Sequence, residues 1–520
     1  NLLKRYQPRE KALVVATVVT EEAELHDTTA NTIPNFPLTP TETFKEVLVD
    51  GLLPETQREE ELAILAKHPD VLTERPGRTG EQEFSLKLLD DKPVHCRPYP
   101  LPFAKREAVR EEIRAMLALG VIEPAESAYS APVVLVAKKD GSHRFCVDYR
   151  RLNRITEFQV EALPDPGEIF SRVSRARYFS KLDLAKGYWQ IPVRQQDRSK
   201  LAFSTPDGSY QWVVMPFGVQ NAPSIFTRMM HKILEPLRDR GVSNFMDDIL
   251  IATETWEEHM EALTAVLARL RQAGLTAKPT KCHIGFKQLD YLGHTQTENT
   301  IRPEAGKVEQ LRDAKRPTTK TEVRAFLGLA GYYRRYVPNF SAIASPLSDL
   351  TKKNAPTKLE WTSACDTAFT TLKDRLTSDA IVRLPDPTKD FVLRTDACDT
   401  GVGAVLLQDH DGTLFPVAYG SRKLSKPERN YCVTEKECLG IIFGITKFEK
   451  YLYGRRFTLQ TDHQPLAYLA QAKAHNGRLM RWSLFLQQYQ MVTQYIKGRD
   501  NVGAECMSRF AVLANSLQAG

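Results

Sequence analysis

The stretch Asn244–Thr253, NFMDDILIAT, constrains this chain more than any other, because it sets two adjacent carboxylates between apolar runs. An unpaired buried charge destabilises a fold by several kcal/mol, so Asp247 and Asp248 need a reason to be there. An acidic hairpin turn is the ordinary explanation for such a pair, since Asp favours turns. A third carboxylate changes the balance, because Asp183 ends another apolar run, SKLDL.

Carboxylates at the ends of neighbouring strands can gather around divalent cations. Their hard oxygen atoms suit Mg²⁺, which binds proteins through one or two carboxylates together with substrate phosphates. Two such ions roughly 4 Å apart stabilise the attacking and leaving oxygens of a phosphoryl displacement. We therefore predict a two-metal site built from Asp183, Asp247 and Asp248.

Length and composition limit the other choices. A chain of 520 residues is too long for one ordinary core, so we expect several domains. No apolar run approaches the roughly 20 residues of a membrane span, so we expect no membrane partner. The net charge of +7 permits a polyanionic partner. The cysteines are scattered without a CxxC pair, which predicts reduced thiols of an intracellular protein rather than a zinc site.

The periodicity of the chain predicts alternating helices and strands after a Thr- and Pro-rich extension at residues 1–79. A helix is expected at 105–120, with Gly120 as its stop, followed by two strands joined by a KKDG turn. Thr255 and Glu258 form a capping box that starts a helix ending near Gly274. Further predicted segments are strands at 178–184 and 210–218, a helix at 221–237, strands on either side of the Asp pair, and helices within 303–352.

The pattern changes after Pro385 to a compact α/β unit. Three strands with short turns precede a helix at 434–450, a strand at 457–462, further helices and a strand near 491–496. Asp396 and Asp462 end strands of this unit, and Glu437 lies on its helix. Each acid alone could be a turn residue or a surface charge, but together they predict a second two-metal centre.

Several of these segments resemble the reverse transcriptase of gypsy-like LTR retrotransposons (metaviruses). The matching runs are LGVIEPAESAYSAPVVLVAKKDGSHRFCVDYRRLN, KLDLAKGYWQIPV, MPFGVQNAPSIFTRMM, NFMDDIL and YLGH, and the resemblance covers about residues 45–512. It implies a multidomain α/β fold, a right-hand polymerase with fingers, palm and thumb followed by an RNase H-like α/β domain. The implied bounds are 1–79 for an extension that follows a protease, 80–298 for fingers and palm, 299–378 for the thumb with connecting helices, and 379–515 for the RNase H-like domain.

The resemblance also implies roles for individual side chains. Asp183 and Asp247 would hold both metals of the polymerase site with support from Asp248, and Asp396, Glu437 and Asp462 would hold those of the RNase H site. Lys139, Arg144, Tyr188 and Phe217 would contact the incoming dNTP, with Tyr188 excluding a ribose 2′-hydroxyl. Primer and template contacts would come from the turn Tyr291, Leu292 and Gly293, from the thumb arginines Arg324, Arg334 and Arg335, and from Arg478 and Arg481.

Solvated or buried-core explanations stay open for several of these residues. The thumb arginines alternate with tyrosines, and such a helix is more often a solvated face over an aromatic core than a surface for phosphates. The helix with Arg478 and Arg481 can equally be a partly buried amphipathic helix. Tyr188 can be a core aromatic, and the turn at 291–294 an ordinary strand connection.

One position departs from the family pattern. The family ends its RNase H domain with a fourth aspartate, whereas this chain reads NVGAECMSR with Glu505 at that place. The additional methylene moves the carboxylate by roughly 1 Å, enough to disturb a preorganised site. We expect Glu505 to ligate the second metal with slower cleavage, and Glu505→Asp to raise hybrid cleavage without changing polymerisation.

The resemblance implies an RNA-directed and DNA-directed DNA polymerase with ribonuclease H activity. Its partners would be an RNA template, a DNA primer, an RNA–DNA hybrid and dNTPs, and each active site would use two Mg²⁺ ions, with Mn²⁺ as a substitute. We expect a monomer or a substrate-induced homodimer in the cytoplasm, within a virus-like particle. The alternative is a domesticated nucleic-acid-binding protein with weak or absent RNase H activity.

Overall fold

The computed structural model describes residues 42–496, with gaps at 91, 101, 138–142, 163, 353–354, 357, 379–381, 400, 411 and 462–476. Contacts divide the chain into two compact units. One holds the described residues up to Pro164 with Leu182–Ile249 and Met260–Ile284, and the other holds Asp165–Lys181, Leu250–His259 and the residues from Gly285 onward. Within the described part, no helix is both long and apolar enough to cross a membrane.

A mixed sheet contains the strands that end or begin at the first group of aspartates. Its strand order is β1-β10-β5-β9-β8. Side chains next to the aspartates, such as Leu182 and Ile249, are fully buried, so the ends of these strands are fixed by packing. The strands span Leu48–Val49 (β1), Tyr178–Asp183 (β5), Val242–Phe245 (β8), Asp248–Thr253 (β9) and His283–Phe286 (β10).

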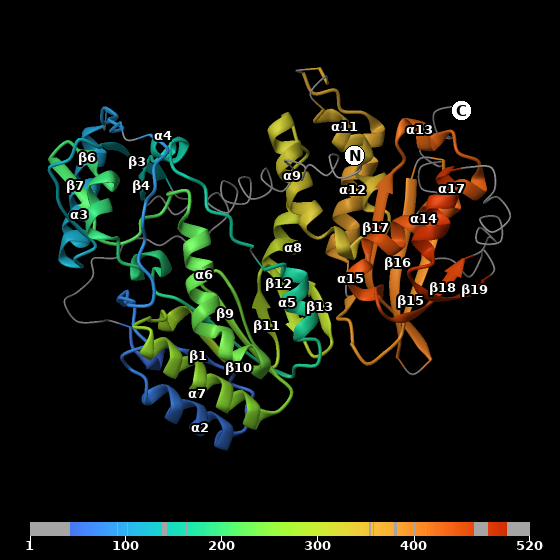
Figure 1. Cartoon of the computed structure of the whole chain (residues 1–520), viewed down its shortest axis with the longest axis horizontal. Helices are drawn as coiled ribbons and strands as arrows, with labels where there is room; N and C mark the ends of the chain where they lie inside the picture. Colours follow the sequence, from blue (N-terminus) through green and yellow to red (C-terminus); the bar gives the residue numbers. More distant parts are fainter. Residues whose placement is uncertain are drawn as a thin grey trace. The chain divides into compact units, whose positions relative to one another are not determined.

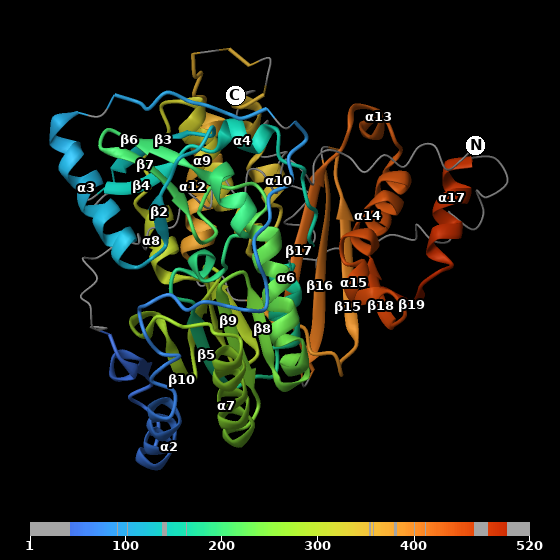
Figure 2. The ribbon, with the colours of Figure 1, turned by 60° about the vertical axis from the view of Figure 1, so that its left-hand side comes forward.

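Two helices accompany this sheet, and both begin where the sequence predicts. Helix α6 (Ala222–Leu234) has Pro223 in its first turn and lies beside β8 in Figure 2. Helix α7 (Trp256–Gln272) starts with the predicted capping box. The Thr255 side chain accepts from the N–H of Glu258 at 3.3 Å, and the Glu258 side chain accepts from the N–H of Thr255 at 3.2 Å. Gly274 follows with φ +68°, a conformation that favours glycine.

A second sheet has the order β2-β7-β6-β3-β4. The predicted hairpin is confirmed as the antiparallel pair β3 and β4, and helix α3 (Phe103–Ala118) ends before Gly120, whose φ is +62°. The strands span Ile122–Pro124 (β2), Ala131–Ala137 (β3), His143–Val147 (β4), Phe203–Thr205 (β6) and Gly208–Trp212 (β7).

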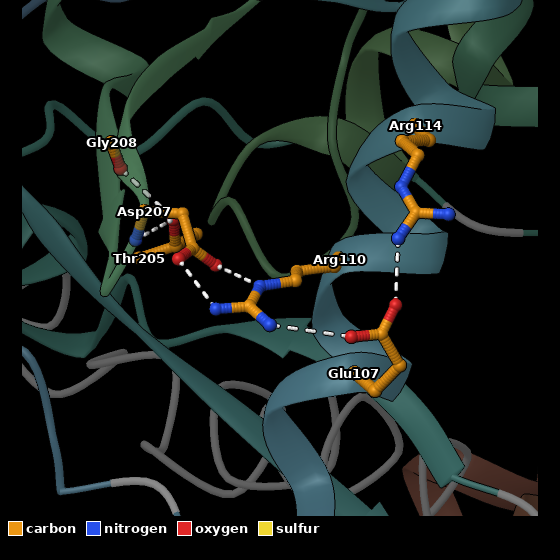
Figure 3. Close-up of polar contacts among 6 residues, drawn as sticks. All are labelled: Glu107, Arg110, Arg114, Thr205, Asp207 and Gly208. Atoms are coloured by element: carbon orange, nitrogen blue, oxygen red, sulfur yellow. Dashed lines mark hydrogen bonds and ion pairs between the residues drawn. The ribbon is translucent and has the colours of Figure 1, made fainter. Parts of the chain in front are cut away.

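An exposed ionic network connects α3 to the turn between β6 and β7 (Figure 3). Arg110 donates two hydrogen bonds to the carboxylate of Asp207, at 3.0 and 3.1 Å. Glu107, one turn earlier on α3, accepts from both Arg110 at 3.3 Å and Arg114 at 2.6 Å. The bidentate geometry fixes the turn against the helix, although exposed pairs of this kind contribute little to stability.

Helices and a small sheet follow β10 in the chain. The sheet has the order β11-β12-β13-β14, with Leu289–Tyr291 (β11), His294–Thr297 (β12), Thr300–Pro303 (β13) and Val382–Arg383 (β14). The helices of this region are α8 (Ala305–Arg312), α9 (Lys320–Tyr332), α10 (Phe340–Ile343), α11 (Ser345–Leu350) and α12 (Ser363–Thr377). Shorter elements elsewhere are α2 (Glu55–Ala66), α4 (Arg150–Arg154), α5 (Pro166–Arg172) and the 3-10 turns η2 (Phe44–Glu46), η3 (Gly187–Gln190), η4 (Gln195–Leu201), η5 (Glu235–Arg240), η6 (Pro279–Lys281) and η7 (Arg334–Tyr336).

The C-terminal sheet confirms the predicted meander followed by alternating helices and strands. Its order is β17-β16-β15-β18-β19; β15, β16 and β17 pair antiparallel, whereas β15 and β18, and β18 and β19, pair in parallel. Figure 1 shows α14 lying along this sheet, where its apolar residues enter one buried cluster. The elements are Phe391–Ala397 (β15), Gly401–His410 (β16), Thr413–Lys423 (β17), Lys426–Arg429 (α13), Val433–Lys447 (α14), Glu449–Leu452 (α15), Arg456–Thr461 (β18), Gly477–Leu486 (α17) and Gln490–Tyr495 (β19).

The N-terminal region differs from the expected extension. Residues Leu48 and Val49 pair in parallel with His283 and Ile284, and so belong to the first sheet. Neighbouring Val47 and Leu53 are buried. A strand of two residues is too short for alternation to reveal it in the sequence.

Candidate active sites

The structure places the first three aspartates at the adjacent ends of neighbouring strands. Asp183 is the last residue of β5, Asp248 is the first of β9, and Asp247 lies in the turn between β8 and β9. The N–H of Leu184 donates to the carbonyl of Asp247 at 3.4 Å, which holds the end of β5 beside this turn. Met246 makes the turn with φ +52°, an uncommon conformation for a side chain of its size.

The electrostatics of Asp247 show that these carboxylates interact. Loss of solvation is the main cause that raises its pKa to about 7, and the charges of Asp248 and Asp183 raise it further. Lys281 opposes this shift, and its Nζ lies 3.3 Å from Oδ2 of Asp183. The three carboxylates repel one another, and one lysine offsets only part of their negative charge. A bound cation would stabilise this arrangement.

Gly187 passes close to Asp247, and the next residue, Tyr188, belongs to a cluster of three aromatic rings. A Cβ on Gly187 would lie 3.3 Å from Cβ of Asp247 and 3.1 Å from the ring of Phe226, so glycine permits the close passage. Tyr188 packs its ring against Phe217 and Phe226, with centroids 5.1 and 5.4 Å apart. The structure therefore brings together Tyr188 and Phe217, the two aromatic residues predicted to contact the nucleotide.

The two basic residues predicted to contact the triphosphate are less defined. Lys139 lies outside the described residues. Arg144 pairs through its backbone with Val136 in the β3–β4 hairpin, and its side chain is outside the description. Their role stays a prediction.

A buried histidine connects the strands that lead to these aspartates. Nε2 of His259 lies 2.6 Å from Oγ of Ser180 on β5, and Nδ1 lies 3.0 Å from Oγ1 of Thr253 on β9. Thr253 donates its single hydroxyl proton to the carbonyl of Thr255 at 3.1 Å, so His259 must donate from Nδ1. Burial lowers the pKa of His259 to about 4, so the ring is neutral and its bare Nε2 accepts from Ser180.

The predicted primer-binding turn has an unusual backbone. Leu292 and Gly293 have φ of +48° and +70°, between buried Tyr291 and buried His294. The predicted arginines Arg324 and Arg334 are exposed and Arg335 is half-buried, and their contact with nucleic acid stays a prediction. The tyrosines among them divide: Tyr332 is half-exposed, whereas Tyr333 and Tyr336 are buried, which supports the aromatic-core alternative for those two.

The second centre is built where α14 crosses β15. Asp396 on β15 and Glu437 on α14 are 6% and 2% exposed. A Cβ on Gly440 would lie 3.5 Å from the carbonyl oxygen of Asp396, and one on Gly444 would lie 2.9 Å from Cγ2 of Thr395. Glu437 precedes Gly440 by three positions and therefore shares the helix face that meets β15. Asp462 and Glu505 lie outside the described residues.

Arg478 makes a compact contact between α17 and the start of α14. It forms an ion pair with Glu435, two residues before Glu437. Its guanidinium lies 4.0 Å from the ring centroid of Tyr431 and 5.6 Å from that of Trp482. Arg481 is exposed. The partly buried alternative thus describes Arg478 well, and a contact of either arginine with a hybrid stays a prediction.

Among the residues that the structure describes, no group of three or more His, Cys, Asp or Glu side chains is placed to hold an ion. The donor chemistry nevertheless fits, since both centres consist of carboxylates. Sequence reasoning found the acids but missed Lys281 and the close-contact glycines. The spacing of Gly440 and Gly444, one helical turn apart, is the available signal for close helix packing.

Comparisons with known proteins agree with this architecture. Residues 136–296 match the family model "Reverse transcriptase (RNA-dependent DNA polymerase)", and residues 386–489 match "RNase H-like domain found in reverse transcriptase". The chain is 38% identical over 445 residues to the Retrovirus-related Pol polyprotein from transposon 297 of Drosophila melanogaster, covering 84% of this chain and 41% of that protein. It is 35% identical over 433 residues to the Transposon Tf2-3 polyprotein of Schizosaccharomyces pombe, covering 82% and 32%.

Solved structures show the same fold. The foamy viral protease-reverse transcriptase in complex with dsDNA aligns with a TM-score of 0.80 at 22% identity, covering 89% of this chain and 99% of that one. The same protein in complex with an RNA/DNA hybrid aligns with a TM-score of 0.74, covering 89% and 64%. The chain spans about two fifths or less of the length of the curated relatives above. The chain carries a reverse transcriptase domain followed by an RNase H-like domain, and its homologues are Pol polyproteins of gypsy-type LTR retrotransposons.

Proposed function

We propose that this chain is an RNA-directed and DNA-directed DNA polymerase that also cleaves the RNA of RNA–DNA hybrids. The observation that carries the polymerase assignment is the placement of Asp183, Asp247 and Asp248 together at the ends of the neighbouring strands β5 and β9, where burial and the charges of the other two acids raise the pKa of Asp247. Carboxylates gathered in this way destabilise a fold, whereas a two-metal site needs them as ligands. On this proposal residues 80–298 form fingers and palm together with the strand Leu48–Val49, residues 299–378 form the thumb, and residues 379–515 form the RNase H-like domain.

Divalent metals are generally used by both kinds of domain, and we propose two Mg²⁺ ions per site, with Mn²⁺ as a substitute. Bound at the carboxylates, the ions would lower the pKa of the attacking hydroxyl or water and stabilise the leaving oxygen. Asp183 and Asp247 would hold them in the polymerase site, beside Lys281, whose Nζ lies 3.3 Å from Oδ2 of Asp183. Asp396 and Glu437, with Asp462 and Glu505, would hold them in the RNase H site.

The remaining residues of the polymerase site would position substrate. The ring of Tyr188 would stand against the sugar and exclude a 2′-hydroxyl, while Phe217, 47% exposed, would pack beneath the nucleotide. The RNA template, DNA primer and dNTPs are the proposed partners, bound by a monomer or a substrate-induced homodimer. The cytoplasmic, virus-like-particle location is proposed from the resemblance alone.

Two matched substitutions test both activities in one protein. Asp247→Asn removes a charge of the first centre and should reduce primer extension on an RNA template by roughly a hundredfold or more. Asp396→Asn should do the same to hybrid cleavage. Each variant should retain the other activity, and Asp239→Asn, at an exposed surface position, should retain both.

Which of the two activities each variant loses decides whether the proposal holds. Loss of both activities in either variant would indicate general misfolding and is checked by the melting temperature of each protein. Extension by the Asp247→Asn protein at the parental rate would refute the polymerase site. Equal incorporation of ribonucleotides and deoxyribonucleotides by the parent protein would refute the role of Tyr188.

The alternative, a nucleic-acid-binding protein with weak or absent RNase H activity, is favoured by one residue. Glu505 stands where the family carries aspartate. If cleavage is slow for this reason, Glu505→Asp should accelerate it and leave primer extension unchanged. No gain on a hybrid substrate would show that the longer side chain is not the cause.

A further inference from the structure

Four hydrogen bonds meet at the two carbonyl oxygens of the turn Leu292–Gly293, which lies between the short strands β11 and β12. Both residues have positive φ, a conformation that is strained for the side chain of Leu292. Strained turns persist only where surrounding contacts determine them. The contacts at this turn therefore indicate what fixes its shape.

Each carbonyl oxygen of the turn accepts two hydrogen bonds, which is its full capacity. The carbonyl of Leu292 accepts from the hydroxyl of Tyr332 at 2.7 Å and lies 2.8 Å from Nδ1 of His294. The carbonyl of Gly293 accepts from the hydroxyl of Tyr333 at 2.6 Å and from the N–H of Glu304 at 3.0 Å. Two of these four donors come from the C-terminal end of α9, about 40 residues away along the chain.

The donors are fixed in place by an aromatic cluster around His294. A carbonyl can only accept, so Nδ1 of His294 carries the proton. Burial lowers the pKa of His294 to about 4, so the ring is neutral. Its ring centroid lies 5.1 Å from that of Phe170 and 5.4 and 5.8 Å from those of Tyr333 and Tyr336. Tyr333 is 1% exposed, so its side chain is enclosed by the protein.

We infer that Tyr333 is a positioning residue, whose hydroxyl sets the turn Leu292–Gly293 at a fixed place relative to helix α9. This inference rests on the proposed function and on the predicted contact of this turn with the primer. A shift of α9 on a bound duplex would then move the turn with it, because the hydrogen bond transmits the displacement. Tyr333 itself touches neither primer nor nucleotide.

The same cluster supplies a matched control. Tyr336 is also buried, lies against the same histidine, and its hydroxyl has no hydrogen-bond partner among the described residues. Tyr333→Phe and Tyr336→Phe thus remove the same atom from the same cluster, but only the first removes a bond to the turn. A general loosening of the core would appear in both.

Two measurements on the full chain test the inference separately. Hydrogen exchange of the segment 289–297 without nucleic acid should be faster in Tyr333→Phe and unchanged in Tyr336→Phe. Single-nucleotide incorporation at saturating dNTP should fall roughly tenfold in Tyr333→Phe, with the dissociation constant of the primer–template unchanged. Cleavage of a hybrid should keep the parental rate.

The outcomes separate this inference from the proposed function. Parental exchange rates in Tyr333→Phe would overturn the positioning role itself. Faster exchange with parental incorporation would overturn its link to the primer. Failure of the parent protein to extend any primer would overturn the proposed function, while the exchange comparison would still decide whether Tyr333 holds the turn.

Discussion

Gly444→Ala is the substitution whose effect follows most directly from the coordinates. The added Cβ would lie 2.9 Å from Cγ2 of Thr395, 3.1 Å from Cβ of Ala404 and 3.3 Å from Cδ1 of Leu393. All three residues are fully buried, so none can swing away into solvent. Non-bonded carbon atoms in optimal van der Waals contact lie about 3.5–4.0 Å apart, so α14 and β15 would have to separate by roughly 0.6–1 Å.

The magnitude follows from two opposing effects. Overpacking of this kind destabilises a core by about 1–3 kcal/mol, whereas replacing a helical glycine by alanine stabilises the helix by about 1 kcal/mol. Gly440→Ala gains the same helix propensity, but its Cβ would meet nothing closer than the carbonyl oxygen of Asp396 at 3.5 Å, an ordinary contact. We therefore expect Gly444→Ala to be about 1–3 kcal/mol less stable than Gly440→Ala.

Urea unfolding of the two variants, followed by a signal from the RNase H-like domain, measures this difference. Hybrid cleavage by Gly444→Ala should also fall, roughly tenfold, because the separation displaces Glu437 from Asp396. Primer extension should not change. A Gly444→Ala protein as stable as Gly440→Ala would refute the reasoning, since it would show that the helix and strand do not press on each other at this point.

Three further predictions follow from single groups. Burial raises the pKa of Glu61 to about 8 from its usual 4.5, so the folded state holds a proton that the unfolded state loses. The free energy of unfolding should therefore fall as the pH rises between about 5 and 8. Glu61→Gln should flatten the corresponding decline in melting temperature, and an unchanged decline would contradict this prediction. Nitrogen-15 NMR at pH 7 should show the proton of His259 on Nδ1, and a proton on Nε2 would refute the assigned hydrogen bond to Thr253. Arg110→Ala should leave the urea midpoint unchanged within error, because its pair with Asp207 is exposed, and a large shift would show that the ionic network is structural.

Much of the fold could be read from the chain because the signals are local. The capping box at Thr255 and Glu258 and the stop at Gly120 depend on neighbours within one or two helical turns. The strand that ends at Asp183 and the strand that carries Asp396 next to its last residue are both visible in the sequence as apolar runs followed by an acid. The two-residue strand at Leu48 is not, because it has no period to detect.

The amino-acid sequence by itself determined which acids stand at the ends of which strands, because a strand shows its buried face through the residues that alternate along it. Only the tertiary structure decided that Lys281 meets Asp183 across 98 positions of the chain and that Tyr333 reaches Gly293 across 40. It also decided that Gly444 has no room for a methyl group. These facts depend on how distant segments pack against one another, and local side-chain periodicity contains no record of that packing.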